Sequence, residues 1–309
     1  MEILELPKLW QHMTEASLIQ SSLEAAAPAG RSLARDAWRR LRRSKSAIVG
    51  GTLLLVIVIG ALLAPLISPY DPIKTSQRTS LEGPSLKHPM GTDRFGRDVL
   101  TRVLWGGRLS LPVGFISVVI AAVIGVALGL IAGFYGGALD AVIMRCVDLL
   151  LAFPGILLAL AIVAILGASL LNLMIAVGIA SIPDYVRITR GTVLTIKERE
   201  FVLAARTIGA RNAALLLRHI LPNVLGPLIV LATLGMASAI ITGSALSFLG
   251  LGIKPPTPEW GNMLSEGREF LQRAWWVAFF PGLAIMLTVF AINLLGDGLR
   301  DALDPRMKN

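Results

Sequence analysis

Residues 111–133, LPVGFISVVIAAVIGVALGLIAG, carry no charged side chain and are long enough to cross the hydrocarbon core of a bilayer as one helix. The composition of the whole chain points the same way, because 54% of its residues are hydrophobic while only 6% are aromatic and 16% are charged. This aliphatic excess is well above that of a soluble domain. The sequence therefore predicts an all-α integral membrane protein.

Five more apolar stretches complete a prediction of six transmembrane helices: residues 46–68, 141–166, 172–186, 223–250 and 275–295. The fourth span in chain order is short and contains Pro183 and Asp184, so we expect it to be broken or to end exposed to the cytoplasm. Arg145 and Asp148 lie close together near the inner end of the third span, where we expect a local ion pair. The deeper positions carry no charge, which disfavours a proton-coupled carrier.

Basic residues determine the predicted orientation. The run at residues 31–45, RSLARDAWRRLRRSK, predicts a cytoplasmic N-terminal tail, residues 1–45, with a basic helix at the membrane surface. Six spans place the C-terminus on the same side, and residues 46–309 form one transmembrane domain. The first external connection is also basic, and we expect pairs such as Arg97 with Asp98 to belong to a folded cap.

Several kinds of chemistry find no support in the sequence. No lysine follows a glycine, so the phosphate loop of an ATPase is absent. The histidines are scattered and expected at the surface, and the single cysteine is expected to be a small buried hydrophobe: His12, His88, His219 and Cys146. The net charge of +9 comes from Lys and Arg placed between the apolar runs, which does not indicate nucleic acid. We therefore expect no catalytic residue, metal or cofactor in this chain.

The most informative polar segment is 197–223, KEREFVLAARTIGARNAALLLRHILPN, which lies between two spans on the predicted cytoplasmic side. Ala204 and Ala205 permit close approach of another helix, Gly209 permits a bend or a helix end, and Pro222 can begin the next helix. The pattern predicts a helix, a turn and a second helix. A simple amphipathic helix at the membrane surface is the alternative.

The spacing in this segment resembles the EAA loop of ABC importer permeases: Ala-Ala, then Gly four residues on, then Leu-Pro with its proline thirteen residues beyond. Leu203 departs from the usual Glu, and His219 from a usual aliphatic residue. Four other segments resemble the second permease of dipeptide, oligopeptide, glutathione and nickel importers: GTDRFGRDVLTRVLWGGRLSL, MRCVDLLLAFPGILLAL, LSFLGLGIKPPTPEWGNML and NLLGDGLRDALDP. The resemblance extends from about residue 39 to the C-terminus.

This resemblance implies a type I ABC importer permease fold with a cytoplasmic coupling helix, in a bacterial inner membrane. It implies a homologous second permease, two ATP-binding subunits that hold ATP and Mg, an extracytoplasmic substrate-binding protein and membrane lipid as partners. The implied function is the membrane-spanning subunit of an ATP-driven importer of di- or oligopeptides, or of glutathione. A stand-alone channel or secondary transporter is the alternative.

Three groups of residues are candidates for this function. The coupling loop, residues 187–222, would dock on an ATPase through Glu200, Ala204, Ala205, Arg206, Gly209, Ala210 and Pro222. The fifth span offers small polar residues for a translocation path, although such residues also serve helix packing: Ser238, Thr242 and Ser244. The proline-rich segment 253–264 offers contacts for the binding protein, with a structural cap as the alternative: Pro255, Pro256, Glu259 and Trp260.

Overall fold

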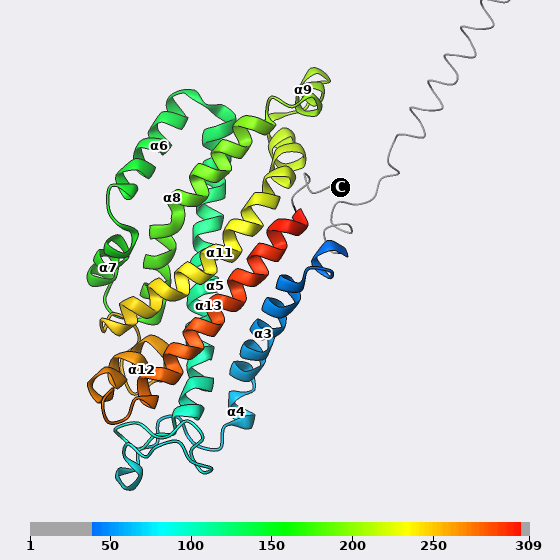
Figure 1. The fold of residues 1–309 in the computed structure, drawn as a ribbon. Coiled ribbons are helices and arrows are strands. Elements are labelled where there is room, and N and C mark those ends of the chain that lie inside the picture. The colour runs from blue at the N-terminus through cyan, green and yellow to red at the C-terminus, as the bar shows by residue number, and fades with distance from the viewer. Residues whose placement is uncertain (1–38, 304–309) are drawn as a thin grey trace, which may run out of the picture.

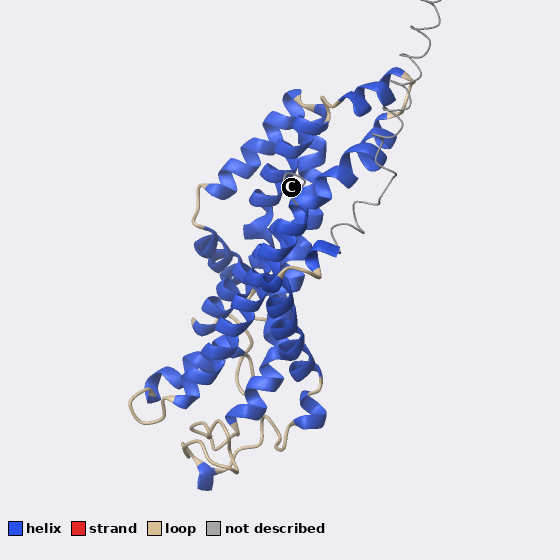
Figure 2. Cartoon of the chain, turned by 45° about the vertical axis from the view of Figure 1, so that its right-hand side comes forward, coloured by secondary structure: helices blue, strands red, loops and turns tan. Residues whose placement is uncertain are grey.

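The computed structural model describes residues 39–303, and this part of the chain consists of helices joined by loops (Figure 2). The predicted N-terminal tail with its basic surface helix lies almost wholly outside the described residues, as does His12. The bounds of the helices are α3 (Lys45–Leu62), α4 (Ala64–Ile67), η1 (Gln77–Thr79), α5 (Val99–Tyr135), α6 (Gly137–Leu151), α7 (Gly155–Leu166), α8 (Leu170–Ile196), α9 (Glu200–Thr207), α10 (Asn212–Ala214), η2 (Leu215–Ile220), α11 (Leu221–Phe248), α12 (Trp260–Gly267), η3 (Arg268–Phe270) and α13 (Trp276–Leu303).

The helices that are long and apolar enough to cross a membrane agree with the predicted all-α membrane fold. Between residues 39 and 303 there are five: α3, α5, α8, α13 and the continuous segment Asn212–Phe248 that ends in α11. A sixth crossing results if the bent pair of α6 and α7 counts as one span. The helices of this pair meet at 89°, because Pro154 stands between them and restricts the residue before it to an extended backbone.

α5 is much longer than the predicted second span, since it begins at Val99 and not at residue 111. Asp98 caps its first turn by accepting a hydrogen bond from the Thr101 amide at 2.8 Å. Arg102 concealed this extension in the sequence, because a charged residue interrupts the apolar run. Pro112 lies inside the helix without ending it.

α8 continues without a break through Pro183, so the predicted broken end of the fourth span is wrong. Pro183 is buried, and α8 lies tightly along α5. A Cβ added to Gly133 of α5 would lie 2.8 Å from the Cβ of Val193 in α8. Such close packing stabilises a membrane helix against its proline. Residues 187–196 of the predicted coupling loop are therefore the last turns of α8.

α5 is the central helix of the bundle and contacts α3, α6, α8, α11, α12 and α13 (Figure 1). α3 lies along α13, where a Cβ added to Gly50 would come within 2.6 Å of the Ala291 carbonyl oxygen. α9 lies at one end of the molecule, called here the α9 end. α12 and the loops between α4 and α5 lie at the opposite end, the α12 end (Figure 1).

Candidate functional site

The end of α9 explains why a glycine stands at position 209. Gly209 has a left-handed backbone with φ of +84°, and its amide donates to the Arg206 carbonyl at 3.0 Å. The Ala210 amide donates to the Ala205 carbonyl at 3.1 Å. These are the two hydrogen bonds of a Schellman motif, which ends a helix where glycine can adopt the left-handed conformation. Of the bend or helix end that the sequence allowed at Gly209, the structure has the helix end.

One face of α9 and a neighbouring lysine fix it to the bundle. Val202 and Ala205 are buried in the core cluster that also contains Phe134 at the end of α5. Lys197, just before α9, donates from Nζ to the Gly133 carbonyl at 3.1 Å. A cation near the C-terminal end of a helix also interacts favourably with the helix dipole. The junction between α8 and α9 is therefore attached to the last turn of α5, while α9 itself packs mainly against η2.

Apolar side chains that sequence reasoning missed are exposed on α9 and at its C-terminal end. Phe201 is 45% exposed, Leu203 41% and Ile208 86%. Beside Phe201 lies a hollow of about 530 Å³ lined by residues of α8, α9 and α11. Exposed apolar side chains beside a hollow are features of a contact surface. The available signal was the presence of these apolar residues in an otherwise charged segment.

The other predicted coupling residues lie on the surface of α9 or just after it. Glu200 and Ala204 are exposed, and Ala210 is half-buried. The Arg206 guanidinium carbon lies 6.0 Å from the ring centre of Phe134, so this side chain extends toward the end of α5.

Pro222 lies in the first turn of α11, but helical structure continues upstream of it. Residues Leu215–Ile220 form a π-helix, and the Leu221 amide donates to the Leu216 carbonyl, one residue further back than in an α-helix. This wider turn accommodates a proline, which has no amide hydrogen to donate. The turn of the predicted motif therefore leads into one long bent helix.

Two ion pairs join α6 to α8. Asp140 and Arg190 form a bidentate pair with oxygen–nitrogen distances of 2.5 and 2.7 Å. Asp148 pairs with Arg187 at 2.8 Å, and about half of each side chain is exposed. The predicted local pair between Asp148 and Arg145 is therefore wrong, because α8 supplies the cation from a different part of the chain.

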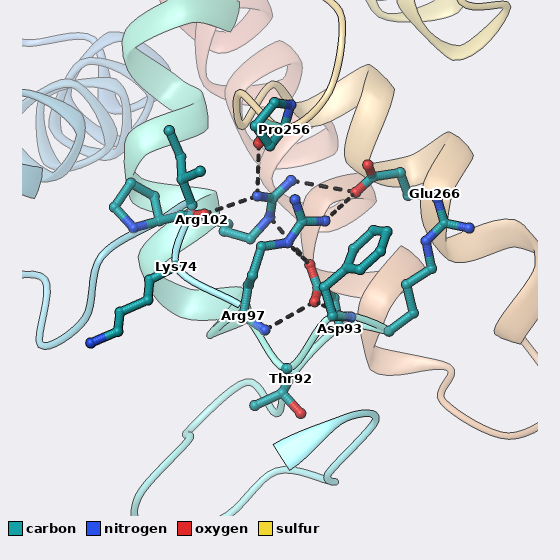
Figure 3. A network of polar contacts seen from close by, with 12 residues as sticks. Lys74, Thr92, Asp93, Arg97, Arg102, Pro256 and Glu266 are labelled. Atoms are coloured by element: carbon teal, nitrogen blue, oxygen red, sulfur yellow. Dashed lines mark hydrogen bonds and ion pairs between the residues drawn. The ribbon is translucent and has the colours of Figure 1, made fainter. Parts of the chain in front are cut away.

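Buried charges form the centre of a folded cap at the α12 end (Figure 3). Arg97 donates to Asp93 at 2.6 Å and to Glu266 at 2.9 Å. Arg102 lies 3.4 Å from Glu266 and donates to the main-chain carbonyl of Pro256 at 3.1 Å. The four charged side chains are at most 9% exposed, and their charges balance. The network ties the loop before α5 to α12 and to the proline-rich segment, so the expected cap is present.

Three expectations for single residues are wrong. His88 is buried in the cap rather than exposed, and its Nδ1 lies 2.9 Å from Asp98 Oδ1. Asp98 is therefore not the partner of Arg97, which pairs with Asp93. Cys146 is exposed on α6 rather than buried. Each outcome depends on which helix or loop packs beside the residue.

Glu259 and Trp260 hold α12 against α5 instead of lying at the surface. The Glu259 carboxylate accepts hydrogen bonds from two amides in the first turn of α12, at 3.0 and 2.9 Å, and one from Ser110 Oγ at 3.0 Å. The Trp260 indole donates to a main-chain carbonyl of α5 at 2.8 Å. Both side chains are 2% exposed and thus unavailable to a binding protein, whereas Pro255 and Pro256 are exposed.

Comparison with known proteins identifies the family of this chain. Residues 125–309 match the family model of the binding-protein-dependent transport system inner membrane component, which covers more than half of the chain. The chain belongs to this family. Residues 32–84 also match the N-terminal TM domain of oligopeptide transport permease C. The chain is therefore a multi-pass inner-membrane permease subunit of an ABC importer, and ATP hydrolysis resides in partner subunits.

Several characterised permeases are similar to this one over nearly their whole length. The dipeptide transport system permease protein DppC of Alkalihalophilus pseudofirmus is 50% identical over 89% of this chain and 90% of its own. The di/tripeptide transport system permease protein DppC of Pseudomonas aeruginosa is 49% identical over 89% and 93%. The glutathione transport system permease protein GsiD of Escherichia coli is 50% identical over 88% and 90%.

The fold of the permease is also found among solved structures. A chain from inward-facing conformations of the MetNI methionine ABC transporter superposes with a TM-score of 0.54 at 18% identity. The superposition covers 65% of this chain and 96% of the other. The two chains therefore share the permease fold.

The predicted path residues lie on α11 of the permease. Ser238 is exposed, and Thr242 and Ser244 are half-buried. The main chain of Ser244 packs directly against Gly261 of α12, so this position contributes to helix packing. Permeases of this family bind no cofactor themselves, and residues 39–303 hold no cluster of three potential metal ligands.

Proposed function

We propose that this permease imports short peptides, including glutathione, through a path that it forms with a sibling permease. Its relatives are named for dipeptide, di/tripeptide and glutathione transport, and all of these are short peptides. The exposed Ser238 on α11 with Thr242 one turn further on supplies polar groups suited to a peptide backbone. The extracytoplasmic binding protein would deliver the peptide at the α12 end, where Pro255 and Pro256 are exposed.

α9 is the proposed docking element for one ATPase subunit, and its geometry is the observation that carries the proposal. The helix is held from behind by buried Val202 and presents Phe201, Leu203 and Ile208 outward. A helix that only lies on lipid headgroups would carry mainly cations on its polar face. Here the exposed charges have both signs, with Glu198 and Glu200 beside Arg199 and Arg206, which favours a protein partner.

ATP binding in the partner subunits would move α9 and the spans attached to it as a rigid body. Such a movement can switch the cavity between inward-facing and outward-facing states. In this orientation the α9 end and both termini lie in the cytoplasm, which agrees with the basic segment that precedes α3.

Gly209 offers the sharpest test of this coupling. Gly209→Pro fixes φ near −65°, against +84° in the structure, and removes the amide that bonds the Arg206 carbonyl. In the purified complex in lipid, we expect peptide-loaded binding protein to stimulate ATP hydrolysis by wild type and not by this variant, with assembly unchanged. Gly226→Ala is the matched control, because Gly226 has open space around it and no left-handed backbone.

Two outcomes would contradict the proposal. Full stimulation of Gly209→Pro would show that the α9 turn does not transmit the signal. Peptide transport by the permease without any ATPase subunit would show a channel or secondary transporter instead.

A further inference from the structure

α5 is anchored to functional segments at both of its ends. It contains 37 residues in one helix, which at 1.5 Å per residue corresponds to about 55 Å. Its first turns lie in the cap at the α12 end, and its last turn accepts a hydrogen bond from Lys197 at the junction of α8 and α9. One element therefore extends from the proposed binding-protein side to the proposed ATPase side.

The outer anchor of α5 is Arg102. Its guanidinium holds the Pro256 carbonyl at 3.1 Å and lies 3.4 Å from the Glu266 carboxylate and 3.5 Å from the Asp93 carboxylate (Figure 3). The side chain is 1% exposed, so these contacts are not screened by solvent. The position of the proline-rich segment relative to α5 is thus fixed by a charged residue of α5 itself.

The inner anchor lies in the last turn of α5, at Gly133 and Phe134. The Gly133 carbonyl accepts a hydrogen bond from Lys197, and Phe134 belongs to the same buried cluster as Val202 and Ala205 of α9. Movement of the junction between α8 and α9 therefore acts on the last turn of α5 through the Lys197 hydrogen bond, beside which the Arg206 guanidinium carbon of α9 lies 6.0 Å from the Phe134 ring centre.

The middle of α5 is packed too closely to bend independently of its neighbours. A Cβ added to Gly114 would lie 2.6 Å from Ile240 of α11, and one added to Gly129 would lie 2.6 Å from Thr189 of α8. Close-packed interiors have low compressibility and transmit displacement. A shift imposed at one end of α5 is therefore carried along the helix.

We propose that α5 is the mechanical link between α9 and the proline-rich segment, with Lys197 and Arg102 as the positioning residues at its two ends. This inference rests on the proposed function, in which the two ends meet different partners. ATP-driven movement of α9 would reposition the segment around Pro256, and arrival of a loaded binding protein would be sensed at α9 by the same route, since coupling between two sites is reciprocal.

The test uses the complete complex in lipid and two sets of variants. Lys197→Met removes the inner anchor at nearly unchanged side-chain length, and Lys197→Arg retains a donor. Arg102→Met combined with Glu266→Gln removes the outer anchor while the Arg97–Asp93 pair remains, so no unbalanced charge is buried. Arg300→Met is the matched control, because Arg300 is an exposed cation near the end of α13.

The measured quantity is the ratio of stimulated to basal ATPase activity. We expect each anchor variant to lower this ratio by about fivefold or more, the lower end of typical allosteric coupling. Combining both sets should lower it no further, because one link is already broken. Their effects on thermal stability should add, since the anchors lie about 45 Å apart along α5. Unchanged ratios, or a combined loss equal to the product of the two, would overturn the proposal.

A second measurement separates this proposal from the peptide function. Hydrogen exchange of residues 253–264 is compared with and without Mg and a non-hydrolysable ATP analogue, with neither peptide nor binding protein present. If α5 is the link, the ATP analogue should change the hydrogen exchange of residues 253–264 in wild type and in Lys197→Arg. The same change should be absent in Lys197→Met. No change in wild type would refute the link, whereas a failure of peptide stimulation alone would refute only the proposed substrate.

Discussion

Substitutions at Gly209 perturb the α9 end through the backbone alone. No atom lies within 4 Å of a Cβ built at this position, so added side-chain atoms meet open space. The penalty comes from φ of +84°, which costs an L-residue roughly 1–2 kcal/mol. We therefore expect Gly209→Ala to lower the ratio of docked to undocked α9 by a factor of about 5–30.

A graded series makes this reasoning quantitative. Gly209→Asn should be mildest, because Asn visits the left-handed region more readily than other L-residues. Gly209→Val should be worst, because a β-branched residue at positive φ is a genuine outlier. The assay is the ratio of stimulated to basal ATPase activity at equal complex recovery. The backbone explanation fails if Asn is as harmful as Val, or if Ala is neutral.

The remaining predictions concern the cap and the helix contacts. Arg102→Ala leaves two buried carboxylates facing the single cation Arg97, and this excess negative charge should lower the free energy of unfolding by about 3–5 kcal/mol. Exposed Arg273→Ala should change it by less than about 0.5 kcal/mol, and thermal unfolding of the detergent-purified complex compares the two. Gly50→Ala should separate α3 from α13 at a cost of about 1–3 kcal/mol, whereas Gly51→Ala should be tolerated because its nearest neighbour would be 3.8 Å away, as the melting temperatures would show. Glu259→Ala should lower the free energy of unfolding by about 1–3 kcal/mol, because it removes the cap of α12. If this variant kept its stability but bound the binding protein less tightly, Glu259 would belong to the docking surface instead.

Much of the fold follows from local sequence patterns. A span requires only an apolar run of sufficient length, so all six predicted spans have counterparts in the helices. The end of α9 was also predictable, because the left-handed conformation at Gly209 depends on its own backbone and its immediate neighbours. The family resemblance rested on the same short segments and is confirmed by the family match.

Errors arose where a residue's environment is supplied by a distant part of the chain. α5 extends back to Val99 because the Arg102 charge is balanced by Glu266, which lies 164 residues further along. α8 passes through Pro183 because α5 packs closely beside it, an interaction that no local rule contains.

The sequence by itself determined that this protein is a helical membrane permease and that its α9 segment forms a helix ended by glycine. Hydrophobic length and backbone preference are properties of consecutive residues, so both can be read along the chain. Only the tertiary structure decided which polar residues are buried, which side of α9 is exposed and that α5 joins the two ends. Those features arise from contacts between distant segments, and their energy depends on burial and charge balance that exist only once the helices have packed.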